Sequence, residues 1–452
     1  MGNEVLFRDK PVWKAIFTMS IPAVITILIM VVYNMADMFF IAMLGQDTQV
    51  AAVAVVGPIF SLATAVATML GAGGSAVIAK AMGAQEHEKA KACGSLCIWA
   101  SILLCAGFTV AMLIASKPVL HFLGATADIM DYALQYMQVL AIGAPLMIFS
   151  VVMSTVIRAE GAVVSGMLSN MAGTVTNLIL DPLFILVFGM GVSGAAIATV
   201  LGNLVACLLL ARYILKKSSV LGFSPRYARK QTPLLLHTMA VGLPNGISSI
   251  LSGFASTFSN QLLSQYGSSA IAAMAAANRS IMVITMVQMG ICMGVSPLIA
   301  YNYGAKNLPR LQEVLRKTAI MTAVFGFTVA TACYMGRDGL IGLFLKTTEN
   351  AEIGSRFMFW LLLASPFLGL YYLGSNFLQA AGNAFSATVV SILRQGILLI
   401  PSLYLMHHWI GLAGIAAAHT VSDFGAILFA TALCLHQYQV LLQSIRKENQ
   451  ST

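Results

Sequence analysis

Charged side chains are scarce in this sequence. Only 9% of its 452 residues are Asp, Glu, Lys or Arg, and 59% are hydrophobic. A soluble domain carries about 25% charged residues and about 45–50% apolar ones. A chain of this length with so few charges cannot cover a folded surface with polar groups. The composition therefore excludes an ordinary soluble protein and indicates that much of the surface faces lipid.

The residue patterns of several other protein classes are also missing. The seven cysteines contain no CxxC pair and lie mostly within apolar runs, so we interpret them as small apolar residues and not as a disulfide or metal framework. The sequence has no HExxH motif, no nucleophile elbow and no Walker A motif. These absences argue against a membrane-embedded enzyme and against direct use of ATP. We therefore expect no catalytic residues and no cofactor.

The sequence consists largely of long apolar runs. A helix needs about 20 apolar residues to cross a bilayer, and it satisfies its own backbone N–H and C=O groups where no water is available. The runs are continuous, whereas a membrane β-barrel shows alternating segments of about ten residues. We expect an all-α membrane protein with twelve transmembrane helices, near residues 13–43, 51–79, 92–115, 132–155, 163–188, 193–215, 236–263, 271–301, 314–335, 356–378, 384–406 and 412–436.

Basic residues are distributed unequally between the two sets of loops. If the amino terminus is cytoplasmic, 19 of the 25 Lys and Arg face the cytoplasm, four face outside, and Arg279 and Arg394 lie within spans. Because cytoplasmic loops carry an excess of Lys and Arg, this bias predicts that both termini are cytoplasmic. The same clustering next to spans accounts for the net charge of +9 without a nucleic-acid partner.

The two halves of the chain repeat one another at a spacing of about 221 residues. The segment from Ser75 to Ala84 matches the segment from Ser296 to Ala305, for example. Each half has an even number of spans, so both copies enter the membrane in the same sense. We therefore expect two six-helix lobes related by a pseudo-twofold axis around a central cavity. The predicted parts are an amino-terminal lobe at 1–215, a cytoplasmic linker at 216–235 and a carboxyl-terminal lobe at 236–452.

Few ionisable residues lie deep within the spans. Asp37 lies in the first span, three residues after Asn34, and Asp181 lies in the fifth span, four residues after Asn177. Each pair shares a helix face, and Thr199 adds a hydroxyl from the sixth span. A charge at the bilayer centre costs at least about 2.5 kcal/mol, so such residues face a cavity or a partner. Together they could bind Na⁺ or a proton, or they could instead form a buried hydrogen-bonded group that fixes helix packing.

Other polar residues lie outside this group. Glu160, at the inner end of the fourth span, could guard the mouth of the cavity and attract cationic substrates, or it could pair locally with Arg158. His419 and Asp423 lie one helical turn apart in the twelfth span, and Arg394 lies in the eleventh. These three residues could form a polar network or proton relay in the second lobe, or they could serve only packing.

Pro22 lies within the first span, fifteen residues before Asp37. Proline removes a helix hydrogen bond and permits a kink. A bend at Pro22 could therefore respond to the charge state of the Asp37 carboxylate. The alternative is a static kink that serves only packing.

These residues resemble the MATE (multidrug and toxic compound extrusion) family, and in particular its bacterial multidrug exporters. The resemblance covers essentially the whole chain. The motifs that carry it are Ile21-Pro22, Tyr33-Asn34 with Asp37, Arg158-Ala159-Glu160-Gly161, Asn177 to Pro182, and Gly194 to Thr199.

The resemblance implies a cation-linked site in the first lobe. The matching positions are Asp37, Asn177, Asp181 and Thr199, and a span-four tyrosine that joins such sites corresponds to Tyr136. It also implies an antiport cycle driven by H⁺ or Na⁺, during which the first span bends at its proline. Another branch of the family uses acids in spans seven and eight, but the two spans concerned contain no Asp or Glu here. This departure favours the first-lobe mechanism, and we expect no metal ion other than Na⁺.

The sequence therefore predicts a secondary active antiporter that exports amphipathic, often cationic, drug-like compounds in exchange for H⁺ or Na⁺ by alternating access. The alternative is a flippase for lipid-linked precursors, which would carry several basic residues in its central cavity. Only Arg279 and Arg394 qualify here. We expect a monomer in a bacterial cell membrane, with small organic molecules and the lipid bilayer as its partners.

Overall fold

The computed structural model describes residues 4–42, 47–218, 220–222, 232–342 and 348–451. Nearly all of these residues are helical, and no β-strand occurs within these ranges. Twelve helical segments in this part of the chain are long and apolar enough to cross a bilayer. The prediction of an all-α membrane protein with twelve spans is confirmed, and the chain is a multi-pass membrane protein.

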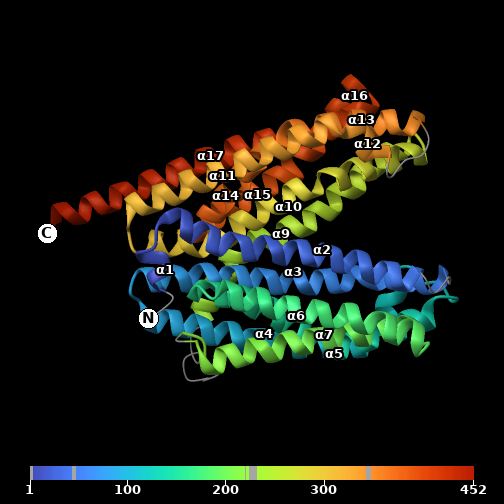
Figure 1. Ribbon diagram of the computed structural model, residues 1–452, viewed down its shortest axis with the longest axis horizontal. Helices are drawn as coiled ribbons and strands as arrows, with labels where there is room; N and C mark the ends of the chain where they lie inside the picture. The colour runs from blue at the N-terminus through green and yellow to red at the C-terminus, as the bar shows by residue number, and fades with distance from the viewer. Residues whose placement is uncertain (1–3, 43–46, 219, 223–231, 343–347, 452) are drawn as a thin grey trace. The chain divides into compact units, whose positions relative to one another are not determined.

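The first six spans follow a short amino-terminal helix, α1 (Glu4–Arg8). They are α2 (Val12–Ala42), α3 (Asp47–Gly83), α4 (His87–Phe122), α5 (Met130–Val156), α6 (Val163–Pro182) and α7 (Gly191–Lys216). A 3₁₀ turn, η1 (Ile157–Glu160), continues α5, and a π-helical turn, η2 (Leu183–Val187), continues α6. Figure 1 shows these helices as long ribbons.

The last six spans include two that are interrupted. The uninterrupted ones are α9 (Thr232–Ser264), α10 (Ser268–Gly304), α11 (Leu308–Met335) and α17 (Leu412–Ser451). The short α12 (Arg337–Gly342) follows α11. The tenth span consists of α13 (Thr348–Ala364), η3 (Ser365–Phe367) and α14 (Leu368–Ala381), and the eleventh of α15 (Ala384–Ile392), the π-helical η4 (Leu393–Leu398) and α16 (Leu399–Ile410).

The chain packs as two compact units. Unit 1 comprises Met1–Leu6 and Ile25–Gly242, and unit 2 comprises Phe7–Val24 and Leu243–Thr452. The beginning of α2 therefore belongs to unit 2, and the beginning of α9 belongs to unit 1. The lobe at 1–215, the linker at 216–235 and the lobe at 236–452 stay a prediction. The packing units exchange the starting segments of two helices.

Glycines let the exchanged part of α9 approach unit 1 closely. A Cβ added to Gly73 of α3 would lie 1.9 Å from the carbonyl oxygen of Thr238, and one added to Gly242 of α9 would lie 1.8 Å from the carbonyl oxygen of Met69. Small residues allow such backbone contact between membrane helices. The hydroxyl of Thr238 also lies 3.5 Å from the sulfur of Cys93 on α4. These contacts account for the place of the α9 segment in unit 1.

The exchanged part of α2 is held in unit 2 in the same way. A Cβ on Gly294 of α10 would lie 2.6 Å from the carbonyl oxygen of Met19. Ser20 donates a hydrogen bond from Oγ to the carbonyl oxygen of Ile291 at 3.3 Å. Gly294 occupies the place in the second half that Gly73 occupies in the first, so the repeat reproduces the crossing in both units.

Arg310 of α11 fixes the segment before α2 to unit 2. Its Nε donates to the carbonyl oxygen of Phe7 and its Nη2 to that of Lys10, each at 2.7 Å. The ring of Phe7 is fully buried and stacks on Tyr301 with 5.1 Å between ring centres. A cation near the last carbonyls of a helix satisfies groups that the helix itself leaves unpaired.

The tenth span is interrupted because Pro366 has no backbone N–H to continue the α-helix. Gln288 of α10, which is fully buried, donates from Nε2 to the carbonyl oxygens of Pro366 and of Thr322, each at 3.2 Å. A side chain thus satisfies a carbonyl at the break, as the absence of water in a membrane requires.

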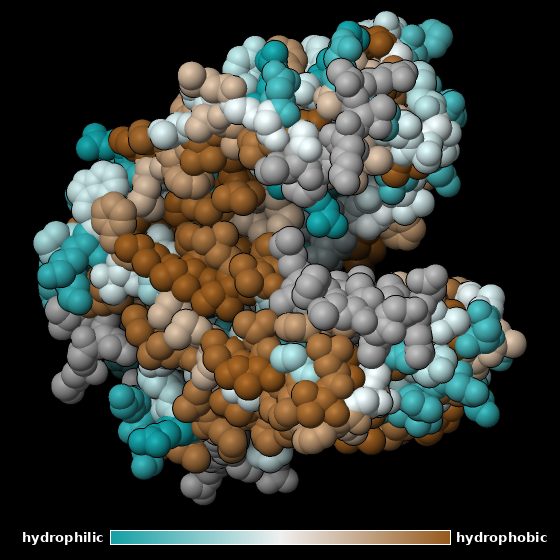
Figure 2. Space-filling view, turned by 45° about the vertical axis from the view of Figure 1, so that its right-hand side comes forward, coloured by the Kyte–Doolittle hydropathy of each residue, from teal (hydrophilic) through white to brown (hydrophobic). Residues whose placement is uncertain are grey.

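Each unit has an apolar core and an apolar outer surface. In unit 1 the core lies among α3, α5 and α7, and in unit 2 the largest cluster involves α9, α10, α13 and α17. Many large apolar side chains are nevertheless exposed, and Figure 2 shows them over much of the surface in view. On a soluble protein such patches would mark a binding interface. On these spans they are the surface that faces lipid.

We expect Gly242→Ala to destabilise the protein, because its Cβ would overlap backbone that cannot move without separating two helices. Overpacking of this kind costs about 1–3 kcal/mol. Gly253, on the same helix, has no atom within 4 Å of an added Cβ. Gly253→Ala should therefore be neutral or gain about 0.5–1 kcal/mol. Thermal unfolding of the purified variants measures the difference, and equal melting temperatures would contradict the tight crossing.

Candidate functional site

A buried polar cluster lies between α6 and α7 of unit 1. Asn177 and Asp181 lie one turn apart on α6, so both side chains can reach Thr199 on α7. Nδ2 of Asn177 donates to Oδ1 of Asp181 at 3.2 Å and to Oγ1 of Thr199 at 3.3 Å. Asp181 is 0% exposed, and the other two residues are buried as well. The structure therefore brings together three residues that the sequence predicts for one site.

Side chains from two further helices extend this cluster. The hydroxyl of Tyr33 on α2 lies 3.4 Å from Oγ1 of Thr199. Nδ2 of Asn203 donates to the backbone carbonyl of Thr199 at 2.8 Å, and Ser150 of α5 donates to Oδ1 of Asn203 at 2.9 Å. Sequence analysis missed Asn203 and Ser150. The position of Asn203, one turn after Thr199 on the same helix face, is a signal that could have found it.

The remaining predicted members of the site are placed less closely. Asp37 and Asn34 belong to helix α2, but their side chains lie outside the described residues, and their part in the site stays a prediction. Tyr136 of α5 is buried in the apolar cluster among α3, α5 and α7. Its membership of the cation site also stays a prediction.

The chemistry of the cluster suits a cation or a proton. Oδ1 of Asn177 is buried and has no hydrogen-bond partner within the described part of the chain. Its Nδ2 donates to oxygens of both Asp181 and Thr199. A half-turn of the amide would present Oδ1 instead, so that the three side chains offer only oxygen ligands, which hard cations prefer. A protonated Asp181 could donate a hydrogen bond at the same place.

Glu160 binds the segment that follows α7. Its carboxylate is 3% exposed. Oε1 accepts hydrogen bonds from Oγ of Ser218 at 2.5 Å and from the backbone N–H groups of Val220 and Leu221 at 2.9 and 3.3 Å. Oε2 accepts a bond from the hydroxyl of Tyr213 at 3.1 Å. The carboxylate thus holds the start of the inter-lobe connection against unit 1.

The structure shows hydrogen-bond partners for Glu160 that the sequence did not suggest, and its role at the mouth of a cavity stays a prediction. The carboxylate is enclosed by the segment that it binds and is not open to solvent. The guanidinium of Arg158 donates to the carbonyl oxygen of Ser154 at 3.1 Å, and no ion pair joins it to Glu160 in the ranges that the structure describes. The donors come from residues more than fifty positions later in the chain, which local sequence spacing does not reveal.

We expect Glu160→Ala to release Val220 and Leu221, because these donors are buried and each unsatisfied group costs about 1–3 kcal/mol. Hydrogen exchange at the amides of Val220 and Leu221 should become at least about tenfold faster. Glu160→Gln keeps one acceptor oxygen and should have a smaller effect. Unchanged exchange in the alanine variant would show that the carboxylate does not hold this segment.

A second polar cluster, in unit 2, contains Arg394 and Asp423, whose side chains are 15% and 18% exposed. Nε of Arg394, in η4, donates to Oδ1 of Asp423 on α17 at 2.8 Å. The guanidinium carbon lies 4.7 Å from the ring centre of Tyr371 and 5.7 Å from that of Tyr372. Ser422 donates to the carbonyl oxygen of Arg394 at 2.5 Å, within the π-helical turn. The cation is therefore neutralised by a carboxylate and covered by aromatic faces, which stabilise a desolvated cation.

His419 lies one turn before Asp423 on α17 and is half-buried. Among the described residues, no hydrogen bond reaches either nitrogen of its ring. The sequence-predicted pairing of Arg394 with Asp423 is present in the structure. A proton relay through His419 stays a prediction.

We expect Asp423→Asn to destabilise the protein by about 3–5 kcal/mol, because it leaves Arg394 buried without its counter-charge. The double variant Arg394→Met with Asp423→Leu removes both charges and should recover most of that loss. Thermal unfolding of the wild type, Arg394→Met, Asp423→Leu and the double variant measures the coupling. Losses that simply add in the double variant would show that the two charges do not stabilise one another.

Twelve lipid-facing helices that enclose buried polar clusters define a class of polytopic helical membrane proteins. A family model described as MatE matches residues 22–183 and again residues 244–405. This chain belongs to the MatE family. The resemblance drawn from its sequence motifs is confirmed, and the two matches fall in the two halves of the internal repeat.

Similar proteins extend over the whole chain. Multidrug export protein MepA of Staphylococcus saprophyticus is 31% identical over 442 residues, covering 96% of this chain and 97% of that protein. The protein of the same name from Staphylococcus aureus is 30% identical over 450 residues, covering 99% and 97%. Crystal structures of a MATE protein in a bent and in a straight conformation both align with a TM-score of 0.91 and 25% identity. They cover 98% of this chain and 98% and 99% of the MATE chains.

Proposed function

We propose that this chain is a secondary active antiporter that exports amphipathic, often cationic, drug-like compounds in exchange for H⁺ or Na⁺. Relatives named as multidrug export proteins, at about 30% identity over nearly the full length, support the export of such compounds. The observation that carries the coupling is the buried cluster of Asp181, Asn177 and Thr199. We assign it the role of coupling site and assign no catalytic role to any residue.

A carboxyl group enclosed by lipid-facing helices supports ion coupling because its charge is costly there. Residues of this kind mark ion and proton pathways in membrane proteins. A proton or cation that binds to Asp181 neutralises the charge and changes which hydrogen bonds Asn177 and Thr199 can form. A π-helical turn begins two residues after Asp181, and such turns are frequent at functional sites. The cluster can therefore exist in two arrangements that differ by one bound cation.

The link from this cluster to a change of conformation runs through α2. Tyr33 of α2 contacts Thr199, so a change in the hydrogen bonds of Thr199 also changes a contact of α2. The same helix passes from unit 2 to unit 1 after Val24, two residues beyond Pro22. We assign Pro22 the role of hinge, because proline weakens a helix at the point where its two parts pack in different units.

The flippase alternative has less support. It calls for several uncompensated basic residues near the membrane centre. Arg394 is neutralised by Asp423, and Arg279 is exposed on α10. We further propose that both termini face the cytoplasm and that the protein acts as a monomer in a bacterial cell membrane.

We expect ethidium efflux from cells or proteoliposomes to follow either an imposed H⁺ gradient or an imposed Na⁺ gradient. Asp181→Asn and Asp37→Asn should abolish the gradient-driven part while the protein still inserts. The matched control is Asp131→Asn, an exposed aspartate at the start of α5, which should transport like the wild type. Normal transport by Asp181→Asn would remove the proposed coupling site. A wild type that moves no dye under either gradient would favour the flippase.

The variant Thr199→Val distinguishes coupling to Na⁺ from coupling to H⁺ in the same assay. Its hydroxyl is a ligand for Na⁺ but is not needed to protonate a carboxylate. If Na⁺ is the coupling ion, the half-maximal Na⁺ concentration should rise at least about tenfold, equal to 1.4 kcal/mol. If H⁺ is the coupling ion, the pH of half-maximal efflux should change much less, although loss of the Tyr33 contact should lower the maximal rate with either ion.

A further inference from the structure

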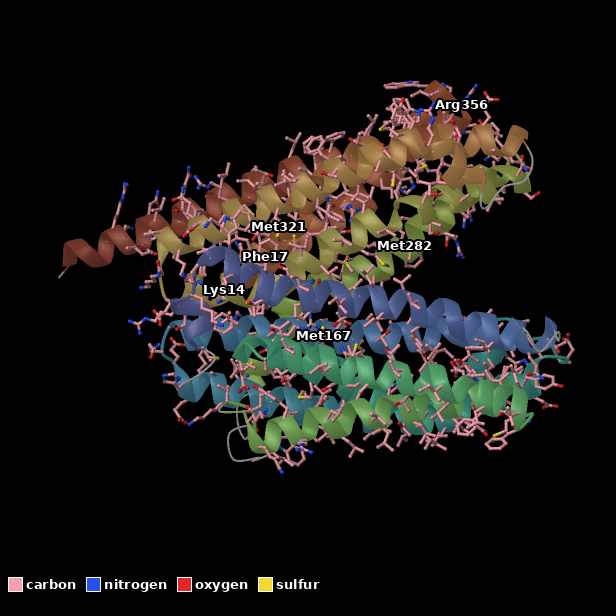
Figure 3. All side chains as sticks on the ribbon, in the orientation of Figure 1. Lys14, Phe17, Met167, Met282, Met321 and Arg356 are labelled. Atoms are coloured by element: carbon pink, nitrogen blue, oxygen red, sulfur yellow. The ribbon has the colours of Figure 1, made fainter. Side chains whose placement is uncertain are left out.

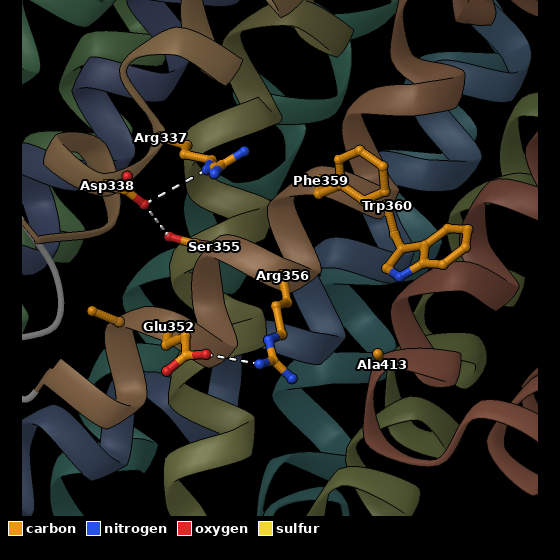
Figure 4. Close-up of a pocket in the computed structure, with 9 residues that line it drawn as sticks. Arg337, Asp338, Glu352, Ser355, Arg356, Phe359, Trp360 and Ala413 are labelled. Atoms are coloured by element: carbon orange, nitrogen blue, oxygen red, sulfur yellow. Dashed lines mark hydrogen bonds and ion pairs between the residues drawn. The ribbon is translucent and has the colours of Figure 1, made fainter.

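A cavity of about 590 Å³ opens at one end of unit 2, where α12, α13 and the start of α17 meet. It lies outside both polar clusters described above. Figure 4 shows charged and aromatic side chains around it. The residues that matter for its chemistry are Arg337, Asp338, Glu352, Arg356, Phe359 and Trp360.

The cavity carries charges of both signs in weak pairs. Nη2 of Arg356 lies 2.7 Å from Oε1 of Glu352, one turn earlier on α13, and Nε of Arg337 lies 3.6 Å from Oδ1 of Asp338. The side chains of Arg356 and Glu352 are 70% and 67% exposed. Exposed ion pairs contribute only about 0–1 kcal/mol. A ligand that brings both a negative and a positive group can therefore replace these partners at little cost.

One wall of the cavity is aromatic. The rings of Phe359 and Trp360 meet edge to face with 5.7 Å between centres, and Thr420 of α17 donates to the carbonyl oxygen of Trp360 at 2.5 Å. The guanidinium of Arg337 lies over the ring of Tyr334, 4.7 Å from its centre. The wall thus offers apolar surface directly beside the charged groups.

The cavity lies where the spans end. The ninth span ends at Met335, which is 82% exposed, and the tenth begins at Asn350. Figure 3 shows Arg356 and Lys14 at opposite ends of unit 2. Aromatic and basic residues at the ends of membrane spans lie at the level of the lipid headgroups. An occupant of this cavity would therefore have its polar part at the headgroup level and its apolar part beside exposed Met335 and Phe359.

We propose that this cavity binds the headgroup of a zwitterionic phospholipid of the phosphatidylethanolamine type. The phosphate lies against the guanidinium groups of Arg356 and Arg337, which suit phosphate oxygens. The ammonium lies against Glu352 and Asp338, and the acyl chains follow the aromatic wall. Inorganic phosphate brings no ammonium and no apolar part, and an anionic lipid leaves both carboxylates without a partner. The site is independent of whether the chain transports drugs.

The test titrates the purified, delipidated full chain with lipids of identical acyl chains and counts bound molecules by native mass spectrometry. Phosphatidylethanolamine should bind at least about fivefold more tightly than phosphatidylglycerol, and glycerophosphoethanolamine and inorganic phosphate should bind weakly. Arg356→Ala should weaken phosphatidylethanolamine at least about fivefold. Glu352→Gln should reduce the preference between the two lipids. Arg446→Ala, an exposed arginine near the other end of α17, should change neither.

Equal binding of the two lipids by the wild type would overturn the proposal, as would unchanged binding of phosphatidylethanolamine by Arg356→Ala. Tight binding of inorganic phosphate would also overturn it, because the site would then recognise a simple anion. Melting temperatures of the variants establish that each is folded. If Arg356→Ala does not fold, Arg337→Ala removes the other guanidinium of the cavity and provides the same test.

Discussion

The absence of water within a bilayer determines how this protein uses its polar side chains. Gln288 satisfies the carbonyl of Pro366 at the break in the tenth span, and Arg394 is paired with Asp423 beneath two tyrosine rings. The polar cluster of unit 1 lies on the corresponding pair of spans, the fifth and sixth, where Asn177 donates a hydrogen bond to Asp181. In unit 2 a guanidinium donates to the acid, whereas in unit 1 the described donor is an amide. This difference between two copies of one repeat supports the proposal that places ion coupling in unit 1.

The exchange of helix ends is the second constraint on the architecture. Gly73 and Gly294, at matching places in the repeat, each accept the start of a helix whose remainder belongs to the other unit. The segments that precede these helices are held by side chains of opposite charge. The guanidinium of Arg310 binds backbone carbonyls before α2, and the carboxylate of Glu160 binds backbone amides before α9. Each unit thus holds the segment before the exchanged helix start with one buried or partly buried charged side chain.

Most of the fold could be predicted from the sequence. Apolar runs locate the membrane spans, basic loops predict their orientation, and the internal repeat divides the spans into two halves. The sequence also predicted the contacts of Asn177, Asp181 and Thr199, since spacing of one turn places side chains on one helix face. It did not reveal Asn203 and Ser150, because hydrogen bonds between helices depend on how the helices are rotated. The partners of Glu160 were missed for a related reason. They are backbone amides of a distant segment, and a backbone amide carries no signature in sequence.

The central claim is that cation binding at the Asp181 cluster is coupled to movement of an organic substrate. Coupling between two ligands is reciprocal in free energy, so a substrate gradient should drive the ion when no ion gradient is imposed. The most direct measurement loads proteoliposomes with ethidium and follows internal pH and Na⁺ as the dye leaves. The account predicts that one of these ions enters as dye exits and that Asp181→Asn removes the ion movement. Dye exit without movement of either ion, or the same ion movement in Asp181→Asn, would contradict it.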